Sequence, residues 1–546
     1  MHTQLLIAGG GCGGTAAGIQ AARLGIQTII VEETPWLGGM ITSAGVSAFD
    51  GNKYAFGGGI FQELRAFLES YYGGPEKTFT GWISLTCFEP KVAKDFLAGI
   101  AEKEKSLTVL YETKVCSVVK EGNRITGLVV KNKKGEKTEI TADITMDATE
   151  FGDLIPLAGI PYRFGRDAQA DTGEEHAPKI ADDIVQDLTF CAILKKFPGE
   201  APRITPSATY NPARFKNSTA VDADTQDEAY LNHKLHSWES FISYAALPYN
   251  KYLLNWPFRS NDYPTTRDIY EEPSTRDSHF KKARQLTLDY VHYMQTVLGH
   301  PEWGIAPDEF PTPDALPFIP YVRESRRIKS IRLMVENDVV PPAGDSRPPL
   351  IKDSIAVGDY FLDHHHSQAF QEPDERLEEN LPDNAPFQIP IGTLIPEGFK
   401  GFLAAEKNIG VSHIVNGCTR LQPCVMLTGQ AAGALAALAI KAKSDPEAVP
   451  VEQVQDILLQ AGCQIYPYKD LYADDPAFIP AQQLALRGVI FRESDFSFQP
   501  EKPVSTEELN PILSLLSLTR DALPGLADSA SRRDVCIAFY HALSGH

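Results

Sequence analysis

Glycine residues near the amino terminus have a spacing that can hold phosphate groups. Gly9, Gly11 and Gly14 fit the pattern GxGxxG. In this pattern the first glycine permits a tight turn, the second lets a pyrophosphate approach the backbone, and the third lets the following helix pack closely. Glu32 lies 18 residues after Gly14 (32 − 14), where a carboxylate can accept hydrogen bonds from ribose hydroxyls. These residues predict a dinucleotide site.

The elements that must position these residues are a strand, a helix and a second strand. Leu5–Ala8 is a short apolar run, typical of a strand buried in a parallel sheet. A helix over 13–24 would direct its free amide groups and positive dipole end at the phosphates. A second strand over 27–31 ends at Glu32. The alternative is a glycine-rich turn in an ordinary α/β protein, and the glycines alone do not distinguish FAD from NAD.

Five further segments give the chain a resemblance to a known family. They are 36–42 (WLGGMIT), 147–154 (DATEFGDL), 323–327 (RESRR), 389–396 (IPIGTLIP) and 420–433 (RLQPCVMLTGQAAG). Together they resemble the FAD-dependent oxidoreductase family often labelled xanthan-lyase-like, within the glutathione-reductase-like FAD superfamily. The resemblance implies an α/β fold with a Rossmann-like, GR2-type FAD-binding domain that carries a β-meander. It further implies an inserted α+β substrate domain and a small helical carboxyl-terminal domain.

The same resemblance implies which residues contact FAD. They are Gly9, Gly11, Cys12, Gly13, Gly14, Glu32, Glu33, Gly38, Gly39, Met40, Thr42, Val115, Ala148, Thr149, Gln422 and Met426. Alternating residues predict that strands over 107–111, 113–119 and 125–130 form the meander. A strand over 144–149 is expected to return to the nucleotide, and in this superfamily the backbone near Val115 meets the adenine.

A polar stretch before the last apolar helix supplies candidate catalytic residues. In the family, a strand over 402–405 and an alanine-rich helix over 429–442 complete the FAD domain, and the helix start is directed at the flavin pyrimidine. His413 is the first candidate for a general base, because a proton must leave the substrate as hydride equivalents move to flavin N5. Arg420 could hold a substrate carboxylate or hydroxyl, or pair with an internal acid such as Glu406.

The middle of the chain, from about 165 to 385, is rich in aromatic, polar and proline residues and is typical of an inserted substrate domain. Leu253–Pro257 and Asn261–Tyr263 offer an aromatic face that would suit a polar ligand such as a carbohydrate. The alternative is that Trp256 fills its own core. Arg323–Arg327 either clamps an anion or forms an internal ion-pair network.

Asp363–His366 has residue types that can bind a metal. Three adjacent histidines cannot all point one way, however, and no second cluster has the spacing of a zinc site. We therefore expect no metal ion here. His365 is instead a second catalytic candidate, as a histidine of the substrate pocket.

Composition limits the classes of partner. The chain has 546 residues, with 51 Lys+Arg against 71 Asp+Glu and a net charge of −20. This charge opposes a broad phosphate-tracking surface, so nucleic acid is not an expected partner. The eight cysteines are too scattered for a disulfide scaffold. The longest apolar run, Ala431–Ile440, is about half the ~20 residues that a membrane span needs. We expect a cytoplasmic protein, or an exported one whose signal peptide is absent from this chain.

The predicted domains interleave along the chain. The FAD-binding domain comprises 1–45, 105–165 and 385–445, the substrate domain 46–104 and 166–384, and a helical tail 450–546. Within the tail, 476–509 resembles a diverged S-layer-homology module, and Ser505 with Glu508 forms a capping box.

The predicted function is an FAD-dependent dehydrogenase or oxidase that moves a hydride from a polar, carbohydrate-like small molecule to flavin N5. His413 or His365 would take the proton. No second GxGxxG follows a strand, so a separate NAD(P)H domain is not expected. The alternative is a carbohydrate-binding or lyase-type protein in which FAD is vestigial. The oligomeric state is not predicted.

Overall fold

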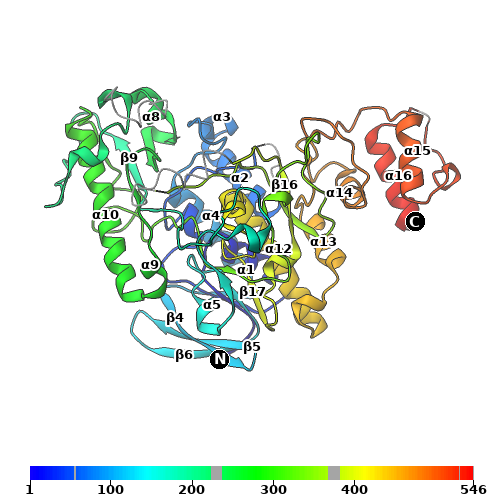
Figure 1. The fold of residues 1–546 in the computed structure, drawn as a ribbon, viewed down its shortest axis with the longest axis horizontal. Coiled ribbons are helices and arrows are strands. Elements are labelled where there is room, and N and C mark those ends of the chain that lie inside the picture. Colours follow the sequence, from blue (N-terminus) through cyan, green and yellow to red (C-terminus); the bar gives the residue numbers. More distant parts are fainter. Residues whose placement is uncertain (54–56, 223–235, 367–380, 528, 545–546) are drawn as a thin grey trace.

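A seven-stranded sheet forms the centre of the protein (Figure 1). The computed structural model describes residues 1–53, 57–222, 236–366, 381–527 and 529–544. The strands follow the order β3 (Leu107–Leu110), β2 (Thr28–Val31), β1 (His2–Ala8), β6 (Lys137–Asp147), β5 (Arg124–Asn132) and β4 (Thr113–Glu121), and β17 (Phe402–Ala404) also pairs with β6. The pairs β3–β2, β2–β1, β1–β6 and β6–β17 are parallel. Their carboxyl ends therefore meet at one edge, where sheets of this kind bind ligands.

Two helices of small residues pack against each other beside this sheet. α1 (Cys12–Arg23) lies against α12 (Gln422–Ala442). A Cβ atom at Gly429 would lie 2.2 Å from the Gly13 carbonyl oxygen, and one at Gly433 would lie 2.3 Å from the Ala17 carbonyl oxygen. Glycine is therefore required at both positions of α12 for the two backbones to approach so closely.

Two of the three strands predicted for the meander belong to it in the structure. β4, β5 and the first half of β6 are antiparallel neighbours, as expected. The strand over 107–111 is not part of the meander, because β3 pairs in parallel with β2 and extends the nucleotide sheet. The strand predicted over 144–149 is the end of β6, which begins at Lys137 in the meander and ends at Asp147 beside Ala8.

Helices cover the rest of the nucleotide region. α2 (Gly59–Tyr72) contacts α12, α4 (Pro90–Lys103) contacts α1 and α2, and α3 (Pro75–Thr78) contacts α2 (Figure 1). The short helices α5 (Leu154–Ala158) and α6 (Gln169–Thr172) follow β6.

The central part of the chain builds a second, antiparallel sheet. Its order is β10 (Ala246–Leu247), β11 (Lys251–Leu254), β9 (Ala192–Lys196) and β13 (Trp303–Ile305). The long helix α10 (Pro273–Thr296) packs on it, with α8 (Trp238–Ser243) and α9 (Arg267–Glu271) nearby. Two-stranded pairs join β8 (Leu188–Thr189) to β12 (Asp262–Tyr263), β7 (Tyr162–Arg163) to β14 (Arg327–Ile328), and β15 (Ser354–Gly358) to β16 (Phe387–Pro390).

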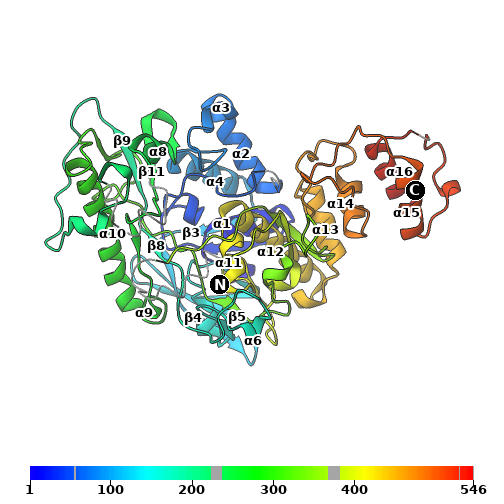
Figure 2. The same cartoon turned by 45° about the horizontal axis from the view of Figure 1, so that its top comes forward.

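The carboxyl-terminal region is helical and consists of two parts. α13 (Val451–Gln460) and α14 (Phe478–Leu486) join the main body, since the Gly57 N–H donates to Gln464 Oε1 at 2.7 Å. α15 (Thr506–Leu515) and α16 (Arg532–Ser544) lie farther out, next to α14 (Figures 1 and 2). The capping box of Ser505 and Glu508 at the start of α15 is confirmed.

Helix α12 is a long apolar helix of the core. It begins at Gln422, seven residues before the predicted start at 429, with Pro423 in its first turn. Within the described residues it is the one helix long and apolar enough to cross a membrane, but 94% of that apolar stretch is buried inside the protein. It is therefore placed as a core helix.

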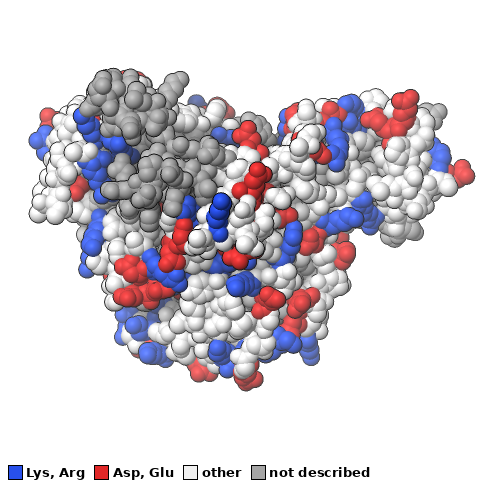
Figure 3. All heavy atoms as spheres, in the orientation of Figure 1, with Lys and Arg blue, Asp and Glu red and all other residues white. Residues whose placement is uncertain are grey.

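The charged surface of the protein is mixed. On the face in Figure 3, basic and acidic side chains are interspersed.

Candidate active site

The glycine loop between β1 and α1 has no room for side chains. Gly9 has a left-handed φ of 94°, and a Cβ atom there would lie 2.2 Å from the Ala148 carbonyl oxygen. A Cβ atom at Gly14 would lie 2.0 Å from the Gly9 carbonyl oxygen. Gly11 is the N-cap of α1 and has no side chain to cap the helix. The first turn of α1 presents backbone N–H groups that suit a pyrophosphate, and the Gly13 N–H among them is bound by the Glu406 carboxylate.

Glu32 lies at the end of β2 and is buried. Its carboxylate accepts the Gly10 N–H at 2.6 Å and the Thr34 N–H at 2.7 Å. Burial raises the pKa of Glu32 to about 7, although the Thr34 contact opposes the shift. These backbone contacts fix the carboxylate beside the glycine loop, where the sequence predicts it.

The predicted Gly-Gly pair turns the chain back onto the glycine loop. Gly38 and Gly39 have positive φ values of 102° and 49°. The Cys12 thiol donates to the Gly38 carbonyl at 3.1 Å, and Thr42 Oγ1 donates to the Leu37 carbonyl at 2.5 Å. Met40 is fully buried in the same turn. A Cβ atom at Gly39 would lie 2.6 Å from Gly11 Cα, so only glycine permits this approach.

The other predicted cofactor residues are spread along the same edge. Ala148 and Thr149 follow β6, and Thr149 Oγ1 donates to Asp147 Oδ1 at 2.7 Å. Val115 is half-buried on β4, and the Glu33 side chain is half exposed, 3.5 Å from Lys114 Nζ. The buried residues Gln422 and Met426 lie in the first two turns of α12.

Sequence reasoning missed a buried charge cluster at the start of α1. Glu406 Oε2 accepts the Gly13 N–H at 2.9 Å. Lys407 Nζ contacts Glu150 Oε2 at 2.5 Å and Glu406 Oε1 at 3.1 Å. Burial raises the pKa of Glu406 to about 7, Lys407 lowers it, and Glu150 raises it. An ionisable carboxylate thus binds an amide that a pyrophosphate would use. The signal available in the sequence is the charged pair directly after the buried strand β17.

The two catalytic candidates of the carboxyl-terminal segment lie apart. His413 begins α11 (His413–Thr419), with Ser412 as its N-cap, and Arg420 is its C-cap. A helix of seven residues is about 10 Å long at 1.5 Å per residue. His413 and Arg420 therefore lie at opposite ends of α11.

His413 is buried and held by a carboxylate. Its Nδ1 contacts Glu324 Oε1 at 3.0 Å, and its backbone N–H donates to Asp167 at 3.0 Å. Burial alone raises the pKa of Glu324, but His413 and Arg327 lower it below its ordinary value. An ionised carboxylate on Nδ1 favours the tautomer with a free Nε2, which is the arrangement of a general base.

His365 has a carboxylate at each ring nitrogen. Its Nδ1 is 2.8 Å from Asp262 Oδ2, and its Nε2 is 3.3 Å from Asp363 Oδ2. Burial and the Arg323 charge lower the pKa of His365. The two carboxylates raise it by more, so it lies above the ordinary histidine value. This arrangement favours the imidazolium, which has no lone pair with which to accept a proton.

Arg420 pairs with Asp363 rather than with the expected Glu406. Its Nη2 is 2.7 Å from Asp363 Oδ2, and its Nη1 donates to the Tyr321 hydroxyl at 2.5 Å. Glu406 was the acid suggested by proximity in sequence, but it turns toward α1. Arg420 Nε is buried and has no hydrogen-bond partner among the described residues.

The Arg323–Arg327 segment forms an internal ion-pair network, one of its two predicted roles. Arg323 pairs with Asp262 at 3.1 Å, Arg326 with Asp153 at 3.1 Å, and Arg327 with Asp167 at 2.8 Å. All three arginines are at most 3% exposed. These buried pairs fix the walls of the site around α11.

Trp256 fills the core of the central region instead of forming a ligand platform. It is 1% exposed, and its Nε1 donates to the Ser218 carbonyl at 2.8 Å. Its ring packs edge-on against Phe241 and Tyr244, with centroids 5.1 Å away in both cases.

Among the described residues, one group of acids has ligand atoms close enough for a metal ion: Glu89, Asp308 and Glu309. Lys251 Nζ already lies 2.6 Å from Glu89 and 2.8 Å from Asp308, and it also contacts Glu309. The lysine supplies the positive charge that balances these carboxylates.

The fold and the glycine loop define a dinucleotide-binding protein of the Rossmann-like class. The sequence model of the family described as FAD dependent oxidoreductase matches residues 4–458. The chain belongs to this family, and it is therefore an FAD-dependent oxidoreductase. The match ends before the segment that resembles an S-layer-homology module, and it carries no xanthan-lyase label. Neither of those two finer resemblances is supported. No curated protein matches the chain.

Solved structures with similar folds come from several flavoprotein types. The flavin-dependent brominase Bmp2 is 11% identical with a TM-score of 0.36, and the match covers 100% of both chains. A geranylgeranyl bacteriochlorophyll reductase-like protein from Thermoplasma acidophilum is 11% identical with a TM-score of 0.35, covering 94% of this chain and 96% of that one. L-proline dehydrogenase from P. horikoshii is 17% identical with a TM-score of 0.17, covering 27% of this chain and 22% of that one. At these TM-scores no argument about function follows.

The described residues fit FAD. The backbone N–H groups at the start of α1 suit the pyrophosphate, although Glu406 binds that of Gly13. The buried Glu32 carboxylate suits a ribose, and the glycines at 38 and 39 leave space where a Cβ would clash. FAD supplies the hydride-accepting chemistry when it is bound. The protein supplies the pocket and its charges.

Proposed function

We propose that the protein is a dehydrogenase or oxidase that removes a hydride from a carbon of a polar small molecule. The observation that supports this proposal is the set of buried charged groups directly before α12. Arg420, Asp363 and His365 are joined by contacts of 2.7 and 3.3 Å at this position. Buried, paired charges of this kind orient polar groups of a substrate in a space from which water is excluded.

The roles of the chain's residues follow from their geometry. Arg420 donates hydrogen bonds, so it would bind an oxygen atom of the substrate. Both ring nitrogens of His365 contact carboxylates, so His365 would hold Asp262 and Asp363 in place. His413 with Glu324 has the arrangement of a base, at the other end of α11. The carbohydrate-like nature of the substrate stays a prediction. Burial of Trp256 removes the aromatic face on which it partly rested.

The test is anaerobic reduction of the bound flavin. FAD-loaded protein is mixed without oxygen with a panel of sugars, polyols, hydroxy acids and amino acids, and the flavin absorbance is followed. We expect rapid bleaching with at least one hydroxyl-bearing class. A protein that binds FAD but is bleached by no compound of the panel, while dithionite reduces it fully, would contradict the proposal.

A further inference from the structure

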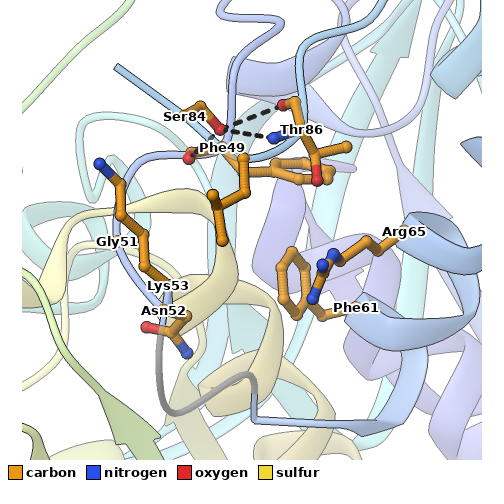
Figure 4. Close-up of a pocket in the computed structure, with 9 residues that line it drawn as sticks. Phe49, Gly51, Asn52, Lys53, Phe61, Arg65, Ser84 and Thr86 are labelled. Carbon is orange, nitrogen blue, oxygen red and sulfur yellow. Dashed lines mark hydrogen bonds between the residues drawn. The ribbon is translucent and has the colours of Figure 1, made fainter. Parts of the chain in front are cut away.

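Asp50 lies on a loop that its surroundings hold in place. Ser84 Oγ donates to the Phe49 carbonyl at 2.6 Å, and the Asp50 N–H donates to Gln422 Oε1 at 3.0 Å. Figure 4 shows the neighbouring residues of this loop lining a small pocket together with Phe61, Arg65, Ser84 and Thr86. Gln422 is the first residue of α12. The structure thus fixes Asp50 beside the start of α12.

The Asp50 carboxylate has a buried oxygen atom without a partner. Among the described residues, no hydrogen bond or ion pair reaches Asp50 Oδ1. An unsatisfied buried carboxylate oxygen carries a large cost, so it marks a place where a ligand group is expected. Burial raises the pKa of Asp50 to about 6, and the Arg420 charge opposes the shift. The carboxylate is therefore mainly ionised at neutral pH.

Charged groups and phenols surround this carboxylate. The charges that act on Asp50 are those of Arg420, Asp363, Lys53 and His365, and its own charge acts on Cys87, Cys191, Tyr244, Tyr321 and Tyr360. The other two acids of this group are paired, since Asp363 contacts Arg420 and His365, and Asp262 contacts Arg323 and His365. Asp50 Oδ1 has no such partner among the described residues.

The charged residues around Asp50, namely Arg420, Asp363 and His365, form with it what we call the chamber. This chamber also contains a hydrogen-bond donor without a partner. Arg420 Nε is buried and unbonded within the described chain, and Arg420 is the residue whose charge acts most strongly on Asp50. A hydroxyl group can donate one hydrogen bond and accept another. It would therefore donate to the Asp50 oxygen and still accept a hydrogen bond from a donor such as an arginine, whereas a carboxylate of a substrate would be repelled by Asp50.

We propose that Asp50 is a catalytic residue, the base that accepts the proton of a substrate hydroxyl, and that the substrate is therefore an alcohol. This inference rests on the proposed hydride transfer. In the step, the O–H bond of the alcohol breaks and its proton goes to Asp50, while the C–H bond breaks and its hydrogen leaves as hydride with the electron pair. The alcohol is thereby oxidised by two electrons to a carbonyl. FAD, when bound, would supply the acceptor of this hydride and its two electrons.

Asp50 replaces His413 and His365 in this role. His365 has both ring nitrogens in contact with carboxylates. His413 begins α11, about 10 Å along the helix from Arg420. Asp50 instead contacts the residue that begins α12. His413 is then a residue that positions α11 through Glu324 and Asp167.

The test compares Asp50→Asn with His413→Gln in FAD-loaded protein. With an alcohol that bleaches wild type, the reduction rate should rise with pH through about 6, because the base must be ionised. Asp50→Asn should slow reduction about 10²- to 10⁴-fold and remove this pH dependence. His413→Gln should keep it. Asp95→Asn, on an exposed acid of α4, is the matched control and should behave as wild type.

Two outcomes would overturn the proposal. In one, Asp50→Asn reduces within a few-fold of wild type. In the other, the rise of the reduction rate with pH is lost only in His413→Gln. If Asp50→Asn does not retain FAD, Asp50→Glu is used instead. Its reduction rate should still rise with pH, but with a shifted midpoint. An unshifted midpoint contradicts the assignment.

A second measurement separates this inference from the proposed function. The absorbance of oxidised FAD in wild type should change with a midpoint near pH 6, and Asp50→Asn should lack that transition. This titration needs no substrate. A panel in which no compound bleaches the flavin would refute the proposed function. Bleaching by amino acids but by no alcohol would refute the alcohol substrate, and identical flavin titrations in wild type and Asp50→Asn would refute the role of Asp50.

Discussion

The cofactor edge and the chamber beside Arg420 are built in opposite ways. The cofactor edge is shaped mainly by backbone atoms and glycines, with the Glu32 and Glu406 carboxylates beside them. A Cβ at Gly9 or Gly14 would lie 2.0 to 2.2 Å from a carbonyl oxygen. The chamber consists of charged side chains from segments far apart in sequence, such as Arg420 and Asp363, 57 residues away. Shape therefore determines the first region, and charge determines the second.

This difference implies different responses to mutation. A backbone site fails when atoms are added, because a carbonyl oxygen cannot move away without breaking strand pairing. A buried charge site fails when one partner is removed, because the other is left uncompensated. The predictions below test each region in its own way.

The largest loss of stability and of FAD binding is expected for Gly13→Val. A Cβ atom at Gly13 would lie 1.6 Å from the Ala405 carbonyl oxygen, so α1 cannot dock beside β17. We expect destabilisation by more than about 3 kcal/mol and loss of FAD. Gly99→Ala is the control, because no atom lies within 4 Å of its Cβ position. Thermal unfolding and retained flavin absorbance are measured; equal behaviour of the two variants would contradict the steric argument.

Arg420→Gln should have the next largest effect. It leaves the Asp363 carboxylate without its arginine, which typically costs about 3–5 kcal/mol for a buried pair. Arg124→Gln breaks an ion pair with Asp445 in which the arginine side chain is 41% exposed, and it should cost about 0–1 kcal/mol. Denaturant unfolding of both variants checks the comparison. Similar losses would show that Arg420 is not a structural charge of the chamber.

A smaller change in FAD affinity is expected when the pH is varied. Glu406 has a pKa of about 7, so it is neutral below and negative above this value. When ionised it holds the Gly13 N–H and repels the pyrophosphate. FAD affinity should therefore fall above pH 7, by at most about tenfold per pH unit for one proton. Flavin fluorescence during titration of apoprotein measures this, and Glu406→Gln should flatten the profile. A slope unchanged in the variant would contradict the linkage.

The smallest effect on FAD is expected when residues 500–546 are removed. α16 contacts α14, and both α15 and α16 lie away from α1 and the central sheet. A truncation at 450 is different, because it also removes α13, α14 and the Gln464 side chain that binds Gly57. We expect the shorter truncation to retain FAD and the longer one to precipitate. Retention of FAD by both proteins would contradict this division of the tail.

Sequence reasoning was most successful where the determinants are local. β1, the glycine loop, α1 and Glu32 follow one another within 32 residues, and each has a pattern of its own. The start of α12 was placed seven residues late, although Pro423 is a typical first-turn residue and could have indicated it. β3 was assigned to the meander because a strand pattern does not specify its partner.

The chamber could not be predicted in the same way. Pairing of Arg420 with Asp363 depends on how α11 meets the 363–366 segment, which no local pattern records. Asp50 precedes Gly51 and Asn52 and has the composition of an ordinary turn. Its role depends on an oxygen atom left without a partner after folding. Burial and pairing are properties of the tertiary structure.

The distance in sequence between the two halves of the cofactor edge also matters during synthesis. Gly13 and Glu406, which contact each other at 2.9 Å, are 393 residues apart. At 5–20 residues per second, a ribosome needs about 20–80 s to make the intervening chain. During this time the apolar faces of β6 and α1 lack β17 and α12. FAD capture is therefore an event at the end of translation, and nascent chains of this protein should depend on chaperones until residue 442 has emerged.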